Sequence, residues 1–427
     1  MTFLPNPYSS LLVALVAVSP VASLWRNGLS SVVFYLLVLF GVLAWCRRGG
    51  AIMRAIPAGA PGLRPLAIGG AVFVAVTVLL LYVQDGSLGA EFEKSVRFSL
   101  TALLTLLFLG VPSYRLQAVQ WGMMLTVLFM TGQLLFLAGM FDGRPDTTML
   151  SRYNAVGYGN LLLLFSVLLA YSCGWRVTRW ARAERGLKIL VASVGFVGFL
   201  MSETRTGWLA MPAFALIGLY LLRGQSWRVP ALLLGGFVGV TALGFTVNPV
   251  LQERASLAVT ELRECNGHAD TSVCIRVQLL HASWLMFREN PLTGVGGRDA
   301  FQQQLQELSR KGLVTERVAS DFGEPHNDLL YYLATYGLLV FLAALGFIYL
   351  LPIWYFARLL GRNSGPAQVA AAMGLAWCVG FAAFGMTEMM FRGMRTASLY
   401  AIWVAVLLAL ALQPGRQGPP PGGSGQA

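Results

Sequence analysis

Twelve apolar runs separated by polar turns constrain the fold of this chain more than any other feature. They begin near positions 8, 29, 66, 96, 117, 156, 187, 208, 229, 327, 366 and 396. A membrane-crossing helix needs roughly 17 to 25 mostly apolar residues. We therefore expect an all-α integral membrane protein with about 12 transmembrane helices. Only 12% of the residues are charged, against roughly 25% in soluble domains.

The positions of Lys and Arg predict the orientation. If the termini and every second turn share one side, that side holds fifteen of the 31 Lys and Arg residues and one of the 19 acidic residues, Glu184. Short cytoplasmic loops carry such an excess, so we expect both termini in the cytoplasm. The basic residues lie in short turns without a soluble domain, which indicates membrane lipids, and not nucleic acid, as partners.

Two extended polar segments then face the exterior, residues 141–157 and 248–325. We expect the larger one to form two or three short helices. The predicted division of the chain is nine spans over residues 1–247, the large loop over 248–325, three spans over 326–413 and a disordered tail over 414–427. The tail is rich in Pro and Gly, a composition typical of disorder.

Two cysteines in the large loop, Cys265 and Cys274, lie close together in sequence. Outside the cytoplasm such a pair predicts a disulfide. A zinc site that includes His268, which lies between them, is the alternative interpretation. Three candidate ligands with irregular spacing fall short of a tetrahedral set, so the disulfide is favoured.

The stretch "CIRVQLLHASWLMFREN" predicts a helix whose apolar stripe can lie on the membrane domain. Its stripe repeats at helical spacing through Ile275, Leu279, Ala282 and Met286, widened by Val277, Leu280 and Trp284. The following "PLTGVGGRDAF" contains a Gly-rich turn. It lacks the Lys-Ser/Thr ending of a P-loop, so it is a weak indication of a phosphate site.

Three titratable residues stand where a membrane fold alone would not need them: Arg205 in "SETRTGW", Arg276 after the predicted disulfide, and His326 at the start of the tenth span. Their plain structural interpretations are interfacial anchoring for the arginines and a helix-end bond for the histidine. Pro325 suits a first helical position. We therefore expect His326 in the first helical turn, where the positive helix terminus keeps its imidazole largely neutral.

Other acidic residues have simpler interpretations. Glu91 and Glu93 fit a short solvated loop, and Glu388 fits an ion pair with Arg392 four residues later at a helix end. The chain contains no Asp-x-Asp motif and no serine-hydrolase or Cys-His pattern. The sequence therefore predicts neither a metal nor a cofactor, and it disfavours a sugar-nucleotide transferase that uses a divalent ion.

Three motifs in order, "SETRTGWLA", "IRVQLLHASWLMFRENPLTGVGGRDAF" and "PHNDLLYYLATYGLLVFL", resemble the O-antigen ligase family of bacterial inner membranes. That family has an Arg in the short-loop motif, a second Arg before a Trp-containing helix that ends in Pro-Leu-x-Gly-x-Gly, and His-Asn at the next span. Arg205, Arg276, His326 and Asn327 match those positions. The resemblance covers roughly residues 150 to 350, and O-antigen polymerases and bacterial protein O-oligosaccharyltransferases share the loop pattern.

The resemblance implies a GT-C-like, inverting and metal-independent glycosyltransferase. Such an enzyme moves O-polysaccharide from undecaprenyl pyrophosphate to lipid A-core on the periplasmic face. The resemblance also implies that Arg205 and Arg276 bind the diphosphate, because a guanidinium group pairs with two phosphate oxygens at once. His326 would accept a proton or only position the sugar, and Asn327 would orient the local backbone or bind the sugar. Arg152 in "SRYNAVGYGN" and Arg288 in the loop helix are further substrate-binding candidates.

Two other functions remain open. A polymerase or protein-glycosylating enzyme would use the same chemistry with another acceptor. A transporter is the alternative of a different class, and it would show charged residues in mid-membrane and repeated halves. The notable charges of this chain cluster at the outer surface, which disfavours the transporter.

Overall fold

The fold is all-helical within the part of the chain that the computed structural model describes, and no strand occurs there. The described residues are 4–25, 28–53, 62–84, 89–140, 145–151, 153–224 and 269–413, with isolated residues 226, 235–236, 239, 246, 260–261, 263 and 265.

Eight helical segments of the described residues are long and apolar enough to cross a membrane. They are α1 (Asn6–Trp25), α2 (Leu29–Met53), α3 (Arg64–Gln84), α6 (Ser113–Leu116) with α7 (Val119–Met140), α9 (Ala155–Tyr171) with η1 (Ser172–Gly174), α17 (Asp328–Ala344) continued by η3 (Leu345–Leu350) and α18 (Leu351–Arg362), α19 (Gly365–Gly385) and α20 (Met394–Ala411). These segments agree with the predicted integral membrane protein.

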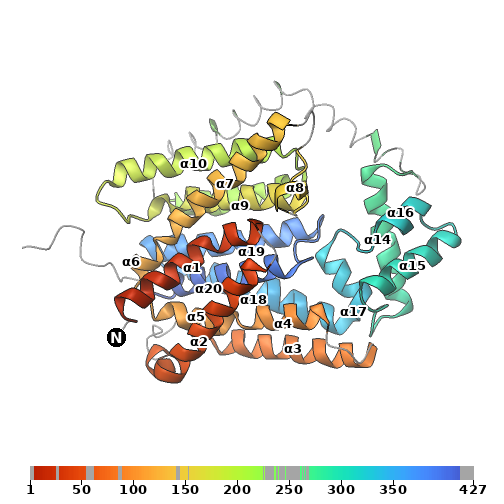
Figure 1. The fold of residues 1–427 in the computed structure, drawn as a ribbon, viewed down its shortest axis with the longest axis horizontal. Coiled ribbons are helices and arrows are strands. Elements are labelled where there is room, and N and C mark those ends of the chain that lie inside the picture. The colour runs from red at the N-terminus through yellow and green to blue at the C-terminus, as the bar shows by residue number, and fades with distance from the viewer. Residues whose placement is uncertain are drawn as a thin grey trace, which may run out of the picture.

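Other helices occupy three more of the predicted spans. These helices are α4 (Ala90–Ser99) with α5 (Thr101–Leu109), α10 (Ala181–Met201), and η2 (Thr206–Leu209) with α11 (Met211–Leu221). The run predicted to start near 229 lies almost wholly outside the described residues. In Figure 1, α19 and α20 lie between α7, α9 and α10 on one side and α2 to α5 on the other. The central α20 is buried along nearly its whole length.

Hydrogen bonds gather the turns at two ends of the bundle in the predicted alternation. At one end the turns predicted on the cytoplasmic side meet, through the pairs Leu4–Gly110, Trp175–Pro366, Asn363–Ala411 and Gln413–Phe108. The turns predicted on the outer side meet at the other end, through the pairs Gln84–Thr335, Arg395–Ser151 and His326–Glu388. The candidate functional residues lie at this second end.

The large loop forms a small helical unit at that end of the bundle (Figure 1). We call residues 269–324 the loop domain; it contains α14 (Ser272–Glu289), α15 (Arg298–Arg310) and α16 (Glu316–Asp321). The predicted α14 stripe is buried against apolar residues of α15 and α16, including Phe301, Leu305 and Val318. The residues predicted to widen the stripe, Val277, Leu280 and Trp284, are exposed. The predicted widening of the stripe was therefore wrong. The helix α14 does pack along α17, and Ala334 of α17 belongs to the same apolar cluster as the stripe, so one face of α14 lies on the membrane domain as expected.

The Gly-rich turn anchors the loop domain to α17. Gly337 has φ 73°, which interrupts the helical hydrogen bonding of α17. The carbonyls of Ala334 and Thr335 instead accept from the N–H groups of Val295 and Gly296, at 2.9 and 3.0 Å. A Cβ at Gly337 would lie 2.3 Å from the Leu292 carbonyl oxygen, so only glycine permits this approach. The turn thus has a structural role, which agrees with its weakness as a phosphate motif.

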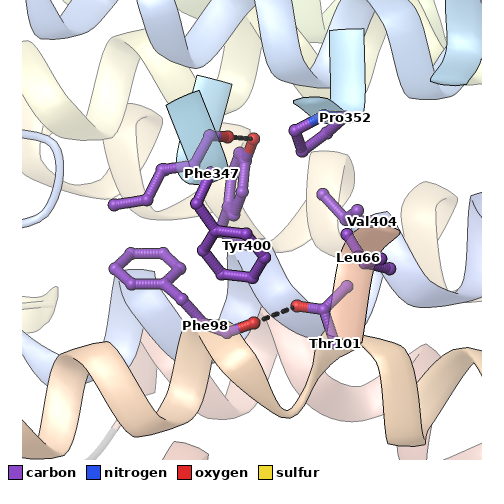
Figure 2. Close-up of a pocket in the computed structure, with 8 residues that line it drawn as sticks. Leu66, Phe98, Thr101, Phe347, Pro352, Tyr400 and Val404 are labelled. Carbon is purple, nitrogen blue, oxygen red and sulfur yellow. Dashed lines mark hydrogen bonds between the residues drawn. The ribbon is translucent and has the colours of Figure 1, made fainter. Parts of the chain in front are cut away.

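A small void between α3, α4, α5, η3 and α20 is part of the packed core. Figure 2 shows Phe98, Phe347 and Tyr400 around it. Its two hydroxyl groups are bonded internally, from Thr101 to the Phe98 carbonyl and from Tyr400 to the Ile348 carbonyl. Its volume of about 10 Å³ is at the lower limit for a single water, so it is no substrate site.

Candidate active site

His326 lies just before α17 and not inside it. Asn327 is the N-cap residue, and its side-chain oxygen accepts from the Leu330 N–H at 2.9 Å. Asn is among the strongest N-cap residues, which explains why the helix begins at Asp328 instead of at Pro325. The prediction that His326 belongs to the first helical turn was therefore wrong. His326 instead has a left-handed backbone with φ 51°.

The imidazole of His326 faces a buried carboxylate. Its Nδ1 lies 3.2 Å from Oε1 of Glu388, whose side chain is only 4% exposed. The same oxygen accepts from the Asn154 amide at 3.0 Å and from the Met389 N–H at 3.3 Å. Three donors from separate parts of the chain thus converge on one carboxylate oxygen.

The predicted ion pair between Glu388 and Arg392 was wrong. Residues 386–393 form a turn between α19 and α20 instead of a helix, so a spacing of four residues does not bring these side chains together. Arg392 pairs instead with Glu324, at 3.2 Å. Because Arg392 pairs elsewhere, the Glu388 carboxylate can bond His326.

Glu388 is held in its ionised form. Burial alone would raise the pKa of this carboxyl, but the hydrogen bond and charge of His326, the Asn154 amide and the charge of Arg276 together lower it below its ordinary value of 4.5. An ionised carboxylate only accepts hydrogen bonds. We therefore assign a ring hydrogen to Nδ1, which donates to Glu388. When the ring carries no second hydrogen, Nε2 is an acceptor. The sequence predicted positive surroundings for His326, but the structure places the negative charge of Glu388 next to its ring.

The residues after His326 fix the turn that carries Glu388. The side-chain oxygens of the buried Asp328 accept from the N–H groups of Met390 and Phe391, at 3.2 and 3.1 Å. The Asn327 amide donates to the Met386 carbonyl at 2.9 Å. Because these bonds join the start of α17 to the turn between α19 and α20, His326 and Glu388 are held in register.

Arg205 is exposed, in a largely buried turn that is tied to the start of α9. Its neighbour Thr204 donates to the Ala155 carbonyl at 3.0 Å, and Thr206 donates to the Asn160 side chain at 2.8 Å. Asn154, the N-cap of α9, bonds Glu388. The Arg205 turn and the Glu388 turn therefore contact the same helix end.

Two left-handed residues mark these turns. Glu203, in the Arg205 turn, has φ 52°, and among the described residues only it and His326 are non-glycine residues with positive φ. Such conformations cost about 1–3 kcal/mol each and cluster at functional sites. Their location at the two turns supports a functional interpretation of this end of the bundle.

Arg276 lies near this centre, whereas Arg288 does not. Arg276 is half-buried in the second turn of α14, and its charge acts on Glu388. Arg288 is exposed twelve residues further along the same helix, about 18 Å away along the axis. The structure thus brings together Arg276 and His326 of the predicted set, with Arg205 in a neighbouring turn.

Arg152 lies outside the described residues. The residues on either side of it contact Arg395: the guanidinium donates to the Ser151 carbonyl at 2.9 Å and lies 4.7 Å from the centre of the Tyr153 ring. Ser151 ends the short α8 (Thr148–Ser151). This contact fixes the outer segment beside α20, close to Asn154.

The predicted disulfide is present in the structure. Cys265 and Cys274 are bonded, with their Cα atoms 5.4 Å apart. Cys274 is buried in the first turn of α14, two residues before Arg276. Paired thiols cannot bind zinc as thiolates, so the alternative metal site is not formed by this pair; His268 lies outside the described residues.

Glu91 and Glu93 do not belong to a solvated loop. Both lie in the first turn of α4, where Glu91 pairs with Lys94 and Glu93 pairs with Arg97. Acidic residues are favoured in the first turn of a helix. That interpretation of the sequence was wrong because the helix begins earlier than its apolar run.

Sequence reasoning missed Glu388, Asn154 and Asp328. A usable signal existed for the two acids, since an ionisable residue next to a long apolar run is rarely placed there without a partner. No local signal identifies Asn154 as a hydrogen-bond partner of Glu388, because the two residues are 234 positions apart in the sequence.

Comparison with known proteins points to the same part of the chain as the candidate active site. The family model described as O-antigen ligase matches residues 189–345, a segment that contains Arg205, Arg276, His326 and Asn327. No curated protein matches the chain. The resemblance seen in the motifs is thus confirmed over this segment, which carries the pattern of the O-antigen ligase family of glycosyl-transferring membrane enzymes.

Proposed function

We propose that this protein is an inverting, metal-independent glycosyltransferase of the bacterial inner membrane. It transfers O-antigen polysaccharide from undecaprenyl pyrophosphate to lipid A-core. The observation that carries the proposal is the pair of His326 and ionised Glu388 within the family-matched segment, with Arg276 close by. The excess of Lys and Arg at the opposite end of the bundle supports a periplasmic site and cytoplasmic termini.

His326 acts as the general base. A hydroxyl of the acceptor sugar attacks the anomeric carbon of the donor, and its proton passes to Nε2 of His326. The new glycosidic C–O bond forms on the face opposite the diphosphate, whose own C–O bond to the sugar breaks, so the configuration inverts. The Nδ1–H bond to Glu388 aims the ring, and the carboxylate stabilises the imidazolium that results.

The arginines stabilise the departing diphosphate. Negative charge grows on its oxygens as the C–O bond breaks. Arg276, whose charge acts on Glu388, and Arg205, in the turn beside the start of α9, each present a planar fork for those oxygens. Arg152, in the outer segment beside Asn154, is a further candidate for the same task. Asn327 orients the local backbone, one of the two roles expected for it, because its side chain caps α17 and bonds the Met386 carbonyl.

The identity of the acceptor distinguishes this proposal from its nearest relatives. An O-antigen polymerase or a protein O-oligosaccharyltransferase would use the same base and the same diphosphate. Lipid A-core is favoured because the matched family is described as O-antigen ligase. A reconstituted assay that offers lipid A-core, a second carrier-linked glycan and an acceptor peptide in parallel separates the three activities.

The decisive experiment replaces His326. We expect His326→Ala and His326→Gln to lose about 10²- to 10⁴-fold in kcat while carrier binding is retained. His326→Asn is the conformational control, because Asn adopts positive φ more readily than most residues; its loss should equal that of the Gln variant. A Gln variant at nearly the wild-type rate would leave His326 with a positioning role only.

A further inference from the structure

A second polar cavity lies beside the His326 site. It has a volume of about 290 Å³ and is bounded by the end of α3, the start of α4, the start of α15, and α17, which meet next to the loop domain (Figure 1). This volume is at the lower end of the roughly 300–1,000 Å³ typical of small-molecule sites. It suits one small unit of a substrate better than a polymer.

The cavity is adjacent to the catalytic pair. One wall is Glu324, two residues before His326, and another is Met389, which directly follows Glu388. Two residues span at most about 7 Å of backbone. Arg205 and Arg276, which we assign to the diphosphate, do not line the cavity. A group bound here would therefore reach His326 from a different direction than the donor does.

The lining has the chemistry of a saccharide site. Two ion pairs face the cavity, Lys94–Glu91 and Arg392–Glu324, and the Lys94 and Glu324 side chains are only 6% exposed. The Lys94–Glu91 pair is buried on both sides, and because buried ion pairs contribute little net stability, stability alone does not account for it. Each pair retains donors and acceptors for sugar hydroxyls. The rings of Tyr331 and Tyr336, 5.9 Å apart, complete the wall.

One positive charge in the lining, Arg298, has no ion-pair partner among the residues that the structure describes. Lys94 and Arg392 are neutralised by Glu91 and Glu324, but Arg298 forms no salt bridge with any residue of the described chain. Arg298 opens α15 and is exposed. A guanidinium at the mouth of a sugar-sized cavity matches an anionic substituent such as a phosphate or a carboxylate.

We propose that this cavity binds one sugar of the acceptor and that Arg298 selects an acceptor with an anionic substituent on or next to that sugar. The inference rests on the proposed glycosyl transfer. It assigns the two substrates to separate regions next to His326, with the donor on Arg276 of α14 and on Arg205, the residue before η2, and the acceptor between α4 and α17.

The test separates acceptor binding from donor binding. In the reconstituted assay, Arg298→Gln should raise the KM for lipid A-core about 10-fold or more, since hydrogen bonds to charged groups contribute about 1.5–3 kcal/mol. The KM for the carrier-linked donor should stay unchanged, and Arg298→Lys should recover part of the loss. Arg310→Gln removes the same charge from the exposed far end of α15 and should have no effect. An unchanged acceptor KM in Arg298→Gln, or an equal rise for the donor, overturns the inference.

A binding experiment distinguishes failure of this inference from failure of the proposed function. The probes are core oligosaccharide freed of lipid A, with its phosphates and after enzymatic dephosphorylation, titrated calorimetrically into the protein in nanodiscs. Stronger binding of the phosphorylated probe, lost in Arg298→Gln, supports the site even if no transfer is seen. If neither probe binds while His326-dependent transfer proceeds, the function stands and the cavity assignment is wrong. Equal binding of both probes refutes the role given to Arg298.

Discussion

Glu388→Gln isolates what the carboxylate charge contributes to the reaction. Oε1 of Glu388 accepts from His326, Asn154 and Met389. The amide oxygen of Gln can keep all three bonds, and the donors on Asn154 and Met389 hold that oxygen, rather than the NH₂ group, toward the histidine. The variant therefore retains the ring orientation and the Nδ1–H tautomer but loses the negative charge.

The expected loss follows from the difference between two kinds of hydrogen bond. A bond to a charged group contributes about 1.5–3 kcal/mol, and a neutral bond about 0.5–1.5 kcal/mol. The difference of about 1–2 kcal/mol, applied to the imidazolium formed in the transition state, lowers kcat about 5- to 30-fold. Glu388→Ala also frees the ring to rotate, so its loss should approach the 10²- to 10⁴-fold expected for removal of the base.

The assay is single-turnover glycan transfer in proteoliposomes, with binding of undecaprenyl pyrophosphate measured on the same samples. A structural role would lower stability and binding together, whereas a positioning role lowers kcat and leaves carrier binding intact. If the Gln variant turns over at the wild-type rate, or if Ala retains as much activity as Gln, the carboxylate does not act through His326.

The same variant has a signature in stability. Because the folded-state pKa of Glu388 is below its ordinary value of 4.5, the ionised group stabilises the fold at neutral pH. That contribution is lost as the pH falls below about 4.5 and through the folded-state pKa. The melting temperature of the wild type should therefore fall more steeply below pH 4.5 than that of Glu388→Gln. Parallel curves for the two proteins would contradict the assignment of an ionised Glu388.

Three further predictions concern the arginines, the loop-domain anchor and the disulfide. Arg276→Lys and Arg205→Lys should each reduce transfer about 10²- to 10³-fold, because an ammonium cannot reproduce bidentate pairing; normal rates in both would make them interfacial anchors. Gly337→Ala should destabilise the protein by about 2–4 kcal/mol in chemical unfolding, since its Cβ would collide with Leu292 in a left-handed backbone. Gly346→Ala, with no atom within 4 Å of the added Cβ, is its control and should be neutral or stabilising. Non-reducing mass spectrometry should recover the linked Cys265 and Cys274 peptides, and two free thiols in freshly extracted protein would contradict the extracellular placement of the loop.

Features with a local signal were predictable from the sequence. Apolar runs of sufficient length identified the spans, and the four-residue stripe through Ile275, Leu279, Ala282 and Met286 identified the buried face of α14. Close cysteine spacing identified the disulfide. In each case the residues that determine the structure are close to each other in the sequence, so their pattern is visible without the fold.

Features that depend on distant segments were not predictable. Glu388 is 62 residues from His326, and its partner could be named only once α17, α19 and α20 were placed. The four-residue spacing to Arg392 suggested a local pair because it presumed a helix, where the chain forms a turn. The start of α17 was misplaced for a related reason: Pro325 and Asn327 are both good helix-start residues, and tertiary bonds from Asn327 and Asp328 to the 386–391 turn favour the later start.

The backbone of His326 connects this choice to the chemistry. With Asn327 as N-cap, His326 is the last residue before the helix, and its φ of 51° turns the imidazole toward Glu388. A left-handed backbone at such a residue costs about 1–2 kcal/mol, which a relaxed helix start at Pro325 would avoid. The bonds that Asn327 and Asp328 make to the 386–391 turn offset this cost. The same bonds position Glu388, so the interactions that strain His326 also supply its partner. A helix start at Pro325 would give up the Asn327 cap and, with it, the alignment of the base.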